Sequence, residues 1–181
     1  MRWIPTLLSL VRLVAAPFVF HTITGGDARN AFLWVVPVGL TDFFDGYLAR
    51  RFGWQSRYGA WADAVSDKVL LSAIFIALAV IGAVPVWLVA LIFGRDVVIL
   101  SMAGYALAFT TMRDFPPSLW GKLSTNVQIF TSGSMLVALT GWWAPASTIA
   151  AVMVWVAAAA TGFSGVHYVY VGVQRLASAR R

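Results

Sequence analysis

The sequence predicts an all-α integral membrane protein built from six transmembrane helices. Three observations support this prediction: 60% of the 181 residues are hydrophobic, only 11% are charged, and the mean hydropathy is +0.81. Soluble domains are usually about 45–50% apolar and about 25% charged. A helical span needs about 20 apolar residues. Six spans with short connections therefore use nearly the whole chain, and we expect a single membrane domain over residues 1–181.

Apolar segments alternate with short stretches that contain glycine or proline. In chain order, the predicted helices cover residues 5–23, 31–50, 58–82, 85–109, 120–140 and 145–173. The residues that separate them are Gly25, Gly26 and Asp27, then Gly53, Gly82 with Pro85, Pro116 with Pro117, and Gly141 with Pro145. In the first segment, Arg12 interrupts the apolar run and Pro17 follows two alanines. We therefore expect a retained span there rather than a cleaved signal peptide.

Basic residues gather in alternate loops, which predicts the orientation of the helices. One predicted side carries Arg2, Arg50, Arg51, Arg57, Arg113, Lys122, Arg175, Arg180 and Arg181. The other side carries only Arg29. Because cytoplasmic loops are enriched in Lys and Arg, both termini are expected in the cytoplasm of a protein that crosses the cell (inner) membrane several times, among membrane lipids. No basic stretch with interleaved aromatics stands clear of the apolar segments, so no nucleic-acid partner is expected.

Four carboxylates are concentrated at the predicted cytoplasmic ends of the second and third helices. The chain has seven carboxylates, all Asp, and no cysteine, which excludes thiolate metal sites and cysteine catalysis. Asp42 and Asp45 are spaced i, i+3, and Asp63 and Asp67 are spaced i, i+4, so each pair shares a helix face. A charge at bilayer depth costs at least about 2.5–3.5 kcal/mol. The four together favour an all-oxygen site for Mg²⁺ or Mn²⁺, with room for two ions.

A simpler interpretation is that each Asp caps a helix or pairs with a nearby basic residue. The basic residues available for such pairs are Arg50, Arg51, Arg57 and Lys68. For the four carboxylates together we favour a ligand site, because Gly46, Ala49 and Gly59 share their helix faces and leave room for a ligand.

These residues carry a resemblance to a known family. From Asp42 to Asp67 the chain matches the pattern D-x-x-D-G-x-x-A-R-x8-G-x3-D-x3-D at every fixed position. This pattern is the signature of the CDP-alcohol phosphatidyltransferase family. Pro5, Leu8, Ser9, Arg12 and Pro17 also resemble the family's amino-terminal P-N-x-L-T, R and P pattern. Thr6 departs from it, because the family usually has Asn at that position.

The resemblance implies that a phosphatidyl group moves from CDP-diacylglycerol to an alcohol, with release of CMP. By position, Asp42 and Asp63 would bridge the two ions, and Asp45 would complete the first metal site. Asp67 would complete the second site and accept the proton of the attacking hydroxyl. Contacts with the nucleotide or the CDP-lipid are expected from Thr6, Asp45, Gly46, Ala49, Arg50, Ser56 and Gly59. The resemblance also implies a homodimer with the active site on the cytoplasmic side.

The alcohol acceptor is the least determined part of the reaction. The pair Asp67-Lys68 looks like the branch that contains phosphatidylglycerophosphate synthases and cardiolipin synthases. Other residues that look like this branch are Gly121, Lys122, Ser124, Thr125, Gln128, Ser164, Gly165 and Tyr168. Glycerol 3-phosphate is slightly favoured as acceptor because that step is the more widespread one.

Contacts with the acceptor are expected from Lys68, Arg95, Arg113 and Lys122, because basic side chains suit phosphate oxygens. The alternative for Arg95 is an ion pair with Asp96 or another Asp. For Arg113 and Lys122 the alternative is anchoring at the membrane interface. The pair Arg95-Asp96 resembles the Arg-Asp pair of cardiolipin synthases, whereas phosphatidylglycerophosphate synthases usually have Arg-Glu there. This resemblance favours phosphatidylglycerol, the acceptor of a cardiolipin synthase.

Two other classes of protein also place carboxylates in membrane helices. A cation-coupled transporter would more often show broken helices and internal duplication, and the sequence shows neither. An Asp-rich prenyltransferase would usually carry two motifs far apart in the sequence, whereas here one cluster spans residues 42–67. Release of CMP from CDP-diacylglycerol in detergent separates an enzyme from a transporter, since no gradient exists there.

Overall fold

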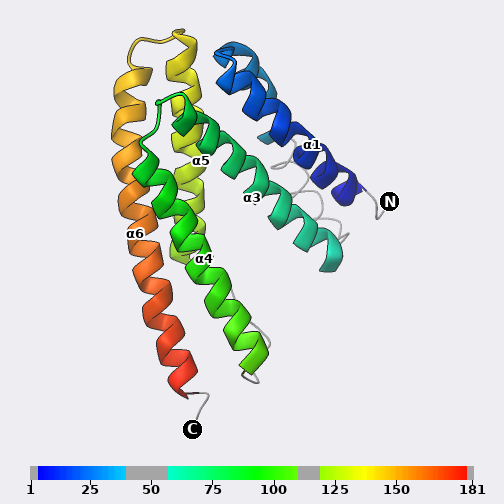
Figure 1. The fold of residues 1–181 in the computed structure, drawn as a ribbon, viewed down its shortest axis with the longest axis vertical. Helices are drawn as coiled ribbons and strands as arrows, with labels where there is room; N and C mark the ends of the chain where they lie inside the picture. The colour runs from blue at the N-terminus through cyan, green and yellow to red at the C-terminus, as the bar shows by residue number, and fades with distance from the viewer. Residues whose placement is uncertain (1–3, 40–56, 110–118, 179–181) are drawn as a thin grey trace. The chain divides into compact units, whose positions relative to one another are not determined.

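The computed structural model describes residues 4–39, 57–109 and 119–178, and these residues form helices, with described turns at residues 25–27, 81–85 and 141–145. The helices are α1 (Ile4–Thr24), α3 (Arg57–Val80), α4 (Val86–Phe109), α5 (Leu119–Thr140) and α6 (Ala146–Ser178), drawn in Figure 1. Residues 28–39 are also helical. The prediction of an all-helical fold is confirmed. The helices α1, α3, α4 and α5 begin and end within two residues of their predicted limits, and α6 runs on beyond its predicted end at residue 173. The predicted end of the helix 31–50 lies outside the described residues.

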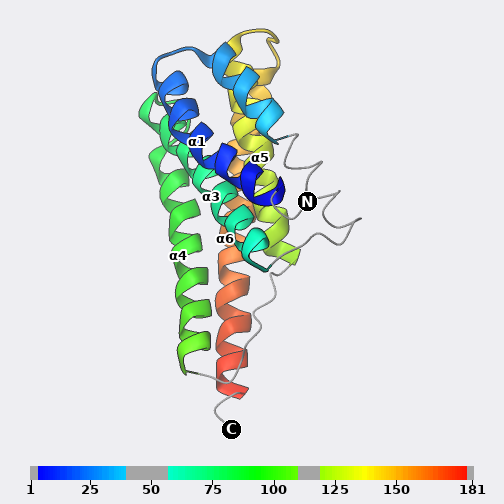
Figure 2. The same cartoon turned by 90° about the vertical axis from the view of Figure 1, so that its right-hand side faces the viewer.

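The helices fall into two compact units. The first contains Met1–Val84 and Met135–Ser147, and the second contains Pro85–Ser134 and Thr148–Arg181. In the first unit, α1 packs against α3 and the two helices run in the same direction, as the views in Figures 1 and 2 agree. In the second unit, α4 and α6 run in one direction and α5 runs in the other (Figure 2).

Apolar side chains at helical spacing form the core of the first unit. In α1, Ala16, Val19 and Ile23 are at most 2% exposed, at intervals of three and four residues. In α3, Ile74 and Leu78 repeat the same interval and are at most 3% exposed. Such a stripe on each helix gives two faces that bury against each other.

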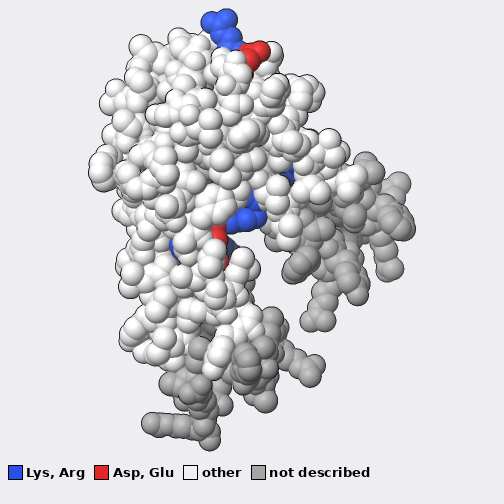
Figure 3. Space-filling view, viewed as in Figure 1, with Lys and Arg blue, Asp and Glu red and all other residues white. Residues whose placement is uncertain are grey.

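The opposite face of α1 is apolar as well. Leu10, Val11, Leu13, Val14 and Phe18 are between 46% and 67% exposed. A helix that is hydrophobic on all sides is typical of an apolar environment rather than water. On the face drawn in Figure 3, most described atoms likewise belong to residues other than Lys, Arg, Asp and Glu.

Glycines with positive φ end α1 and α3 where the sequence predicts breaks. Gly26 has φ 81° and Gly82 has φ 74°, values that residues with a Cβ rarely adopt. After the first turn, the carboxylate of Asp27 accepts a hydrogen bond from the backbone N–H of Asn30 at 3.2 Å. This contact caps the helical residues 28–39.

Within the described residues, one helical stretch meets the length and hydropathy needed to cross a membrane. It is Ala146–Gln174 in α6, with 29 residues and a mean hydropathy of 1.9. A shorter apolar helical stretch covers Leu10–Thr24. The prediction of six spans therefore stays a prediction at this point.

Candidate functional site

Arg12 of α1 and Asp67 of α3 form an ion pair inside the first unit. Nη1 of Arg12 donates a hydrogen bond to Oδ1 of Asp67. The Arg12 side chain is 4% exposed, whereas the Asp67 side chain is 44% exposed. The pair therefore joins a buried cation to a carboxylate that keeps an accessible side.

The local sequence explains why Arg12 needs such a partner. It lies between Val11 and Leu13 in an apolar helix, and both of these neighbours are exposed. A guanidinium buried in apolar surroundings is strongly unfavourable without a counter-charge. The parallel packing of α1 on α3 supplies that charge from Asp67.

The backbone of α3 places three signature residues on one face. Gly59, Asp63 and Asp67 follow each other at intervals of four residues within Arg57–Val80, so they lie one above the other along the helix. Two carboxylates one turn apart, with a glycine one turn before them, suit the all-oxygen ligation that Mg²⁺ and Mn²⁺ prefer. Among the side chains that the structure describes, no group of three or more such ligands occurs.

Most of the predicted metal and nucleotide residues lie outside this description. Those outside the described residues are Asp42, Asp45, Gly46, Ala49, Arg50 and Ser56, and the predicted acceptor residue Arg113 lies outside them as well. The backbones of Thr6, Gly59 and Asp63 are described in α1 and α3, but their side chains are not. The metal and nucleotide sites thus stay predictions, with Asp67 as their one described carboxylate.

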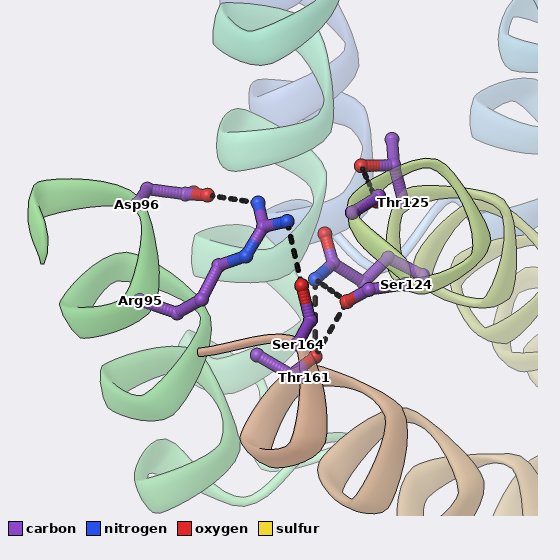
Figure 4. Close-up of polar contacts among 8 residues, drawn as sticks. Arg95, Asp96, Ser124, Thr125, Thr161 and Ser164 are labelled. Carbon is purple, nitrogen blue, oxygen red and sulfur yellow. Dashed lines mark hydrogen bonds and ion pairs between the residues drawn. The ribbon is translucent and has the colours of Figure 1, made fainter. Parts of the chain in front are cut away.

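Arg95 of α4 is the centre of a second cluster, which lies within the second unit (Figure 4). Its Nη1 donates to Oδ1 of Asp96 at 3.0 Å, and its Nη2 donates to Oγ of Ser164 at 2.9 Å. Its guanidinium carbon lies 5.5 Å from the centroid of the Tyr168 ring. The Arg95 side chain is 9% exposed. A carboxylate, a hydroxyl and an aromatic ring thus stabilise this buried cation.

Glycines in α5 and α6 allow Arg95 to approach the neighbouring backbones closely. A Cβ at Gly121 would lie 2.8 Å from the hydroxyl oxygen of Tyr168 and 3.1 Å from Nη2 of Arg95. A Cβ at Gly165 would lie 3.5 Å from Cγ of Arg95. Gly121 is therefore the tighter of the two contacts, because only there would an added methyl overlap its neighbours.

Gln128 of α5 extends the polar contacts toward α6. Its Nε2 donates to Oγ1 of Thr161 at 3.1 Å and to Oγ of Ser124 at 3.4 Å, and these two hydroxyls are 3.3 Å apart. All three side chains are fully buried. Hydrogen bonds of this kind join helices in apolar surroundings. Oε1 of Gln128 is buried and has no hydrogen-bond partner among the residues that the structure describes, as is also true of Nε of Arg95.

The structure gives different surroundings to the predicted acceptor residues. Arg95 forms the ion pair with Asp96 that the sequence offered as its alternative. Lys122 is exposed on α5, and Lys68 is partly buried on α3. Gly121, Ser164, Gly165 and Tyr168, quoted above only for their resemblance to one branch, all lie around Arg95.

Sequence reasoning missed the role of Arg12 as the partner of Asp67. The available signal was an arginine inside an apolar helix, which requires a counter-charge. The sequence does not say which of the seven carboxylates supplies it.

Comparisons with known proteins agree with the signature. A family model described as CDP-alcohol phosphatidyltransferase matches residues 2–163. A probable phosphatidylglycerophosphate synthase of Mycobacterium tuberculosis is 34% identical over 169 residues, which cover 90% of this chain and 78% of the relative. A CDP-diacylglycerol–glycerol-3-phosphate 3-phosphatidyltransferase of Haemophilus influenzae is 27% identical, with 93% of this chain and 92% of the relative covered. A probable CMP-forming cardiolipin synthase of Drosophila melanogaster is 30% identical over 74% of this chain and 46% of the relative.

The contact at Gly121 predicts a position-specific effect of adding one methyl group. Gly121→Ala should lower the free energy of unfolding by about 1–3 kcal/mol, because the Cβ overlaps Tyr168 and Arg95. The matched control is Gly133→Ala on the same helix, where no atom of the described residues, apart from its chain neighbours and the nearby backbone of its own helix, lies within 4 Å of the new Cβ. This control should be neutral or slightly stabilising, since Ala is the better helix former. The free energy of unfolding of both variants is measured in detergent. Equal changes in Gly121→Ala and Gly133→Ala would contradict the described packing.

Proposed function

The chain belongs to the CDP-alcohol phosphatidyltransferase family, and we propose that it transfers the phosphatidyl group of CDP-diacylglycerol to a glycerol-type alcohol and releases CMP. The observation that carries this proposal is the match of residues 2–163 to the family model, with the complete signature inside that range. Relatives named as phosphatidylglycerophosphate synthases and cardiolipin synthases support transfer from a CDP-lipid.

We further propose that the chain is one domain that crosses the membrane six times, with its site at the cytoplasmic side. The apolar, exposed face of α1 and the long apolar stretch in α6 support a membrane location. The alternating distribution of Lys and Arg supports the orientation. Association into a homodimer is part of the same proposal and rests on the family resemblance.

The chemistry of the donor set fits a divalent metal centre. Asp42, Asp45, Asp63 and Asp67 would hold two Mg²⁺ or Mn²⁺ ions, with Asp63 and Asp67 on one face of α3. When bound, such ions neutralise charge on the diphosphate and stabilise the departing CMP. Asp67 would take the proton of the acceptor hydroxyl on a carboxylate oxygen while the new O–P bond forms and the bond to CMP breaks.

The nucleotide is proposed to bind where α1 and α3 begin. Thr6 and Gly59 each lie in the first turn of their helix, and α1 and α3 are parallel and packed together. This arrangement supports contacts from both helices to one CDP-lipid. The remaining nucleotide contacts are proposed for Asp45, Gly46, Ala49, Arg50 and Ser56. Thr6 offers one hydroxyl where the family usually has an amide, so its contact with the nucleotide would differ from that of most relatives.

Glycerol 3-phosphate is the acceptor that we favour. The two relatives named for phosphatidylglycerophosphate synthesis match over 78% and 92% of their length, compared with 46% for the fly cardiolipin synthase. We place direct contact with the phosphate on the exposed Lys122, supported by Lys68 and Arg113. Arg95 already donates to Asp96 through Nη1 and to Ser164 through Nη2, so a phosphate would have to use its remaining N–H groups or replace one of these partners.

Phosphatidylglycerol is the second candidate acceptor, and the Arg95–Asp96 ion pair is the observation that favours it. An arginine already engaged by a carboxylate is less available to a phosphate. Phosphatidylglycerol offers a neutral glycerol headgroup at its free end, which needs no additional basic clamp.

The function is tested by CMP release from CDP-diacylglycerol with purified protein in detergent. Parallel reactions contain Mg²⁺, Mn²⁺ or a chelator, each with glycerol 3-phosphate, phosphatidylglycerol or no acceptor. We expect metal-dependent release that requires glycerol 3-phosphate. Release with phosphatidylglycerol alone would identify the second candidate. Folded protein that releases no CMP under any condition would contradict the enzyme proposal and favour a transporter.

Asp67→Asn should reduce CMP release by about 10²–10⁴-fold, because an amide cannot accept the proton of the acceptor hydroxyl. Asp27→Asn is the matched control, since Asp27 is exposed in the turn after α1 and an Asn there can still cap the following helix. Turnover and helix content by circular dichroism are measured for both variants. Normal turnover in the Asp67 variant would remove this residue from the mechanism.

Lys122→Gln should raise KM for glycerol 3-phosphate at least about tenfold with little change in kcat, as loss of one charge-assisted contact implies. Arg29→Gln serves as the control because Arg29 is exposed on the opposite predicted side of the membrane. Steady-state CMP release against acceptor concentration provides both constants. An unchanged KM would show that Lys122 does not bind the acceptor phosphate.

A further inference from the structure

The Arg12–Asp67 pair is strongly asymmetric in its exposure. The guanidinium side is 4% exposed, and the carboxylate side is 44% exposed. Arg12 approaches Asp67 from within the α1–α3 packing and contacts Oδ1. The accessible part of the Asp67 side chain is therefore available to a ligand from outside this packing.

Stability alone does not explain a charge at position 12. Buried ion pairs can often be replaced by apolar residues with no loss of stability, and sometimes with a gain. Position 12 lies in a helix whose neighbouring positions are all apolar from Leu10 to Ala16. An aliphatic residue would suit these surroundings better than a guanidinium unless the guanidinium has a carboxylate to hold, and among the described residues it contacts Asp67.

We propose that Arg12 is a positioning residue for Asp67: it fixes one carboxylate oxygen through Nη1 and so holds the other toward the reacting groups. This inference rests on the proposed role of Asp67 as proton acceptor and metal ligand. Arg12 itself is buried beneath the carboxylate and acts through it. The planar guanidinium suits this task because its N–H groups have fixed directions, whereas an ammonium on a flexible stem constrains a carboxylate less.

The kinetic test compares Arg12→Gln and Arg12→Lys with Arg29→Gln, which removes an exposed arginine from the same unit. Arg12→Gln should lower kcat at least tenfold while KM for CDP-diacylglycerol changes less than threefold. Arg12→Lys should recover part of the lost turnover, and Arg29→Gln should behave like the wild type. Wild-type kcat in Arg12→Gln would overturn the proposal.

A kinetic double mutant separates positioning from a general effect on the fold. If Arg12 acts through Asp67, adding Arg12→Gln to Asp67→Asn should reduce turnover less than threefold further. A residue that only stabilises the fold would reduce turnover by the same factor in both backgrounds, and that multiplicative result would overturn the proposal.

A spectroscopic measurement on metal-free protein does not depend on activity. With ¹³C-labelled aspartate, the carboxyl resonance of Asp67 is assigned by its loss in Asp67→Asn. Arg12→Gln should shift and broaden this resonance, whereas Arg29→Gln should leave it unchanged. An unaffected resonance in Arg12→Gln would overturn the inference. If the wild type releases no CMP but the resonance responds as expected, the proposed function fails while the positioning contact stands.

Discussion

Arg12 and Asp67 meet across α1 and α3 because a guanidinium inside an apolar helix requires a counter-charge, and the parallel packing of these helices supplies one. The same contact assigns a fixed place to Asp67, the carboxylate that we propose as the proton acceptor. The backbone positions of Asp63 and Gly59 relative to Asp67 follow from the regular helix α3, which puts all three residues on one face. The geometry proposed for the metal and nucleotide sites thus depends on one ion pair.

The second unit satisfies the same requirement with different residues. Arg95 is surrounded by Asp96, Ser164 and the ring of Tyr168, and Gly121 leaves the space in which they approach. In both units a buried arginine is matched by polar groups from another helix, while apolar side chains cover much of the described surface. Among the described residues, Arg12 and Arg95 thus each have polar partners within an otherwise apolar packing.

Hydropathy and glycine placement predicted the helices well because both are local properties. The turns at Gly26 and Gly82 lie where the breaks are predicted, and Asp96 is the sequence neighbour of Arg95, so that pair could be proposed directly. The pairing of Arg12 with Asp67 could not, because it joins residues that only tertiary packing brings together. The signature predicted the importance of Asp67 from its spacing, but spacing gives no information about what holds the carboxylate in place.

The most direct test of this account is a double-mutant cycle on the unfolding free energies of Arg12→Gln, Asp67→Asn and the double variant in mixed micelles. If the ion pair positions Asp67, the sum of the two single-variant losses of unfolding free energy should exceed the loss in the double variant by at least about 1 kcal/mol. This difference is within the range expected for residues in contact. Effects that add to within about 0.5 kcal/mol would show that the two side chains do not interact. In that case the described basis for the position of Asp67 would be wrong.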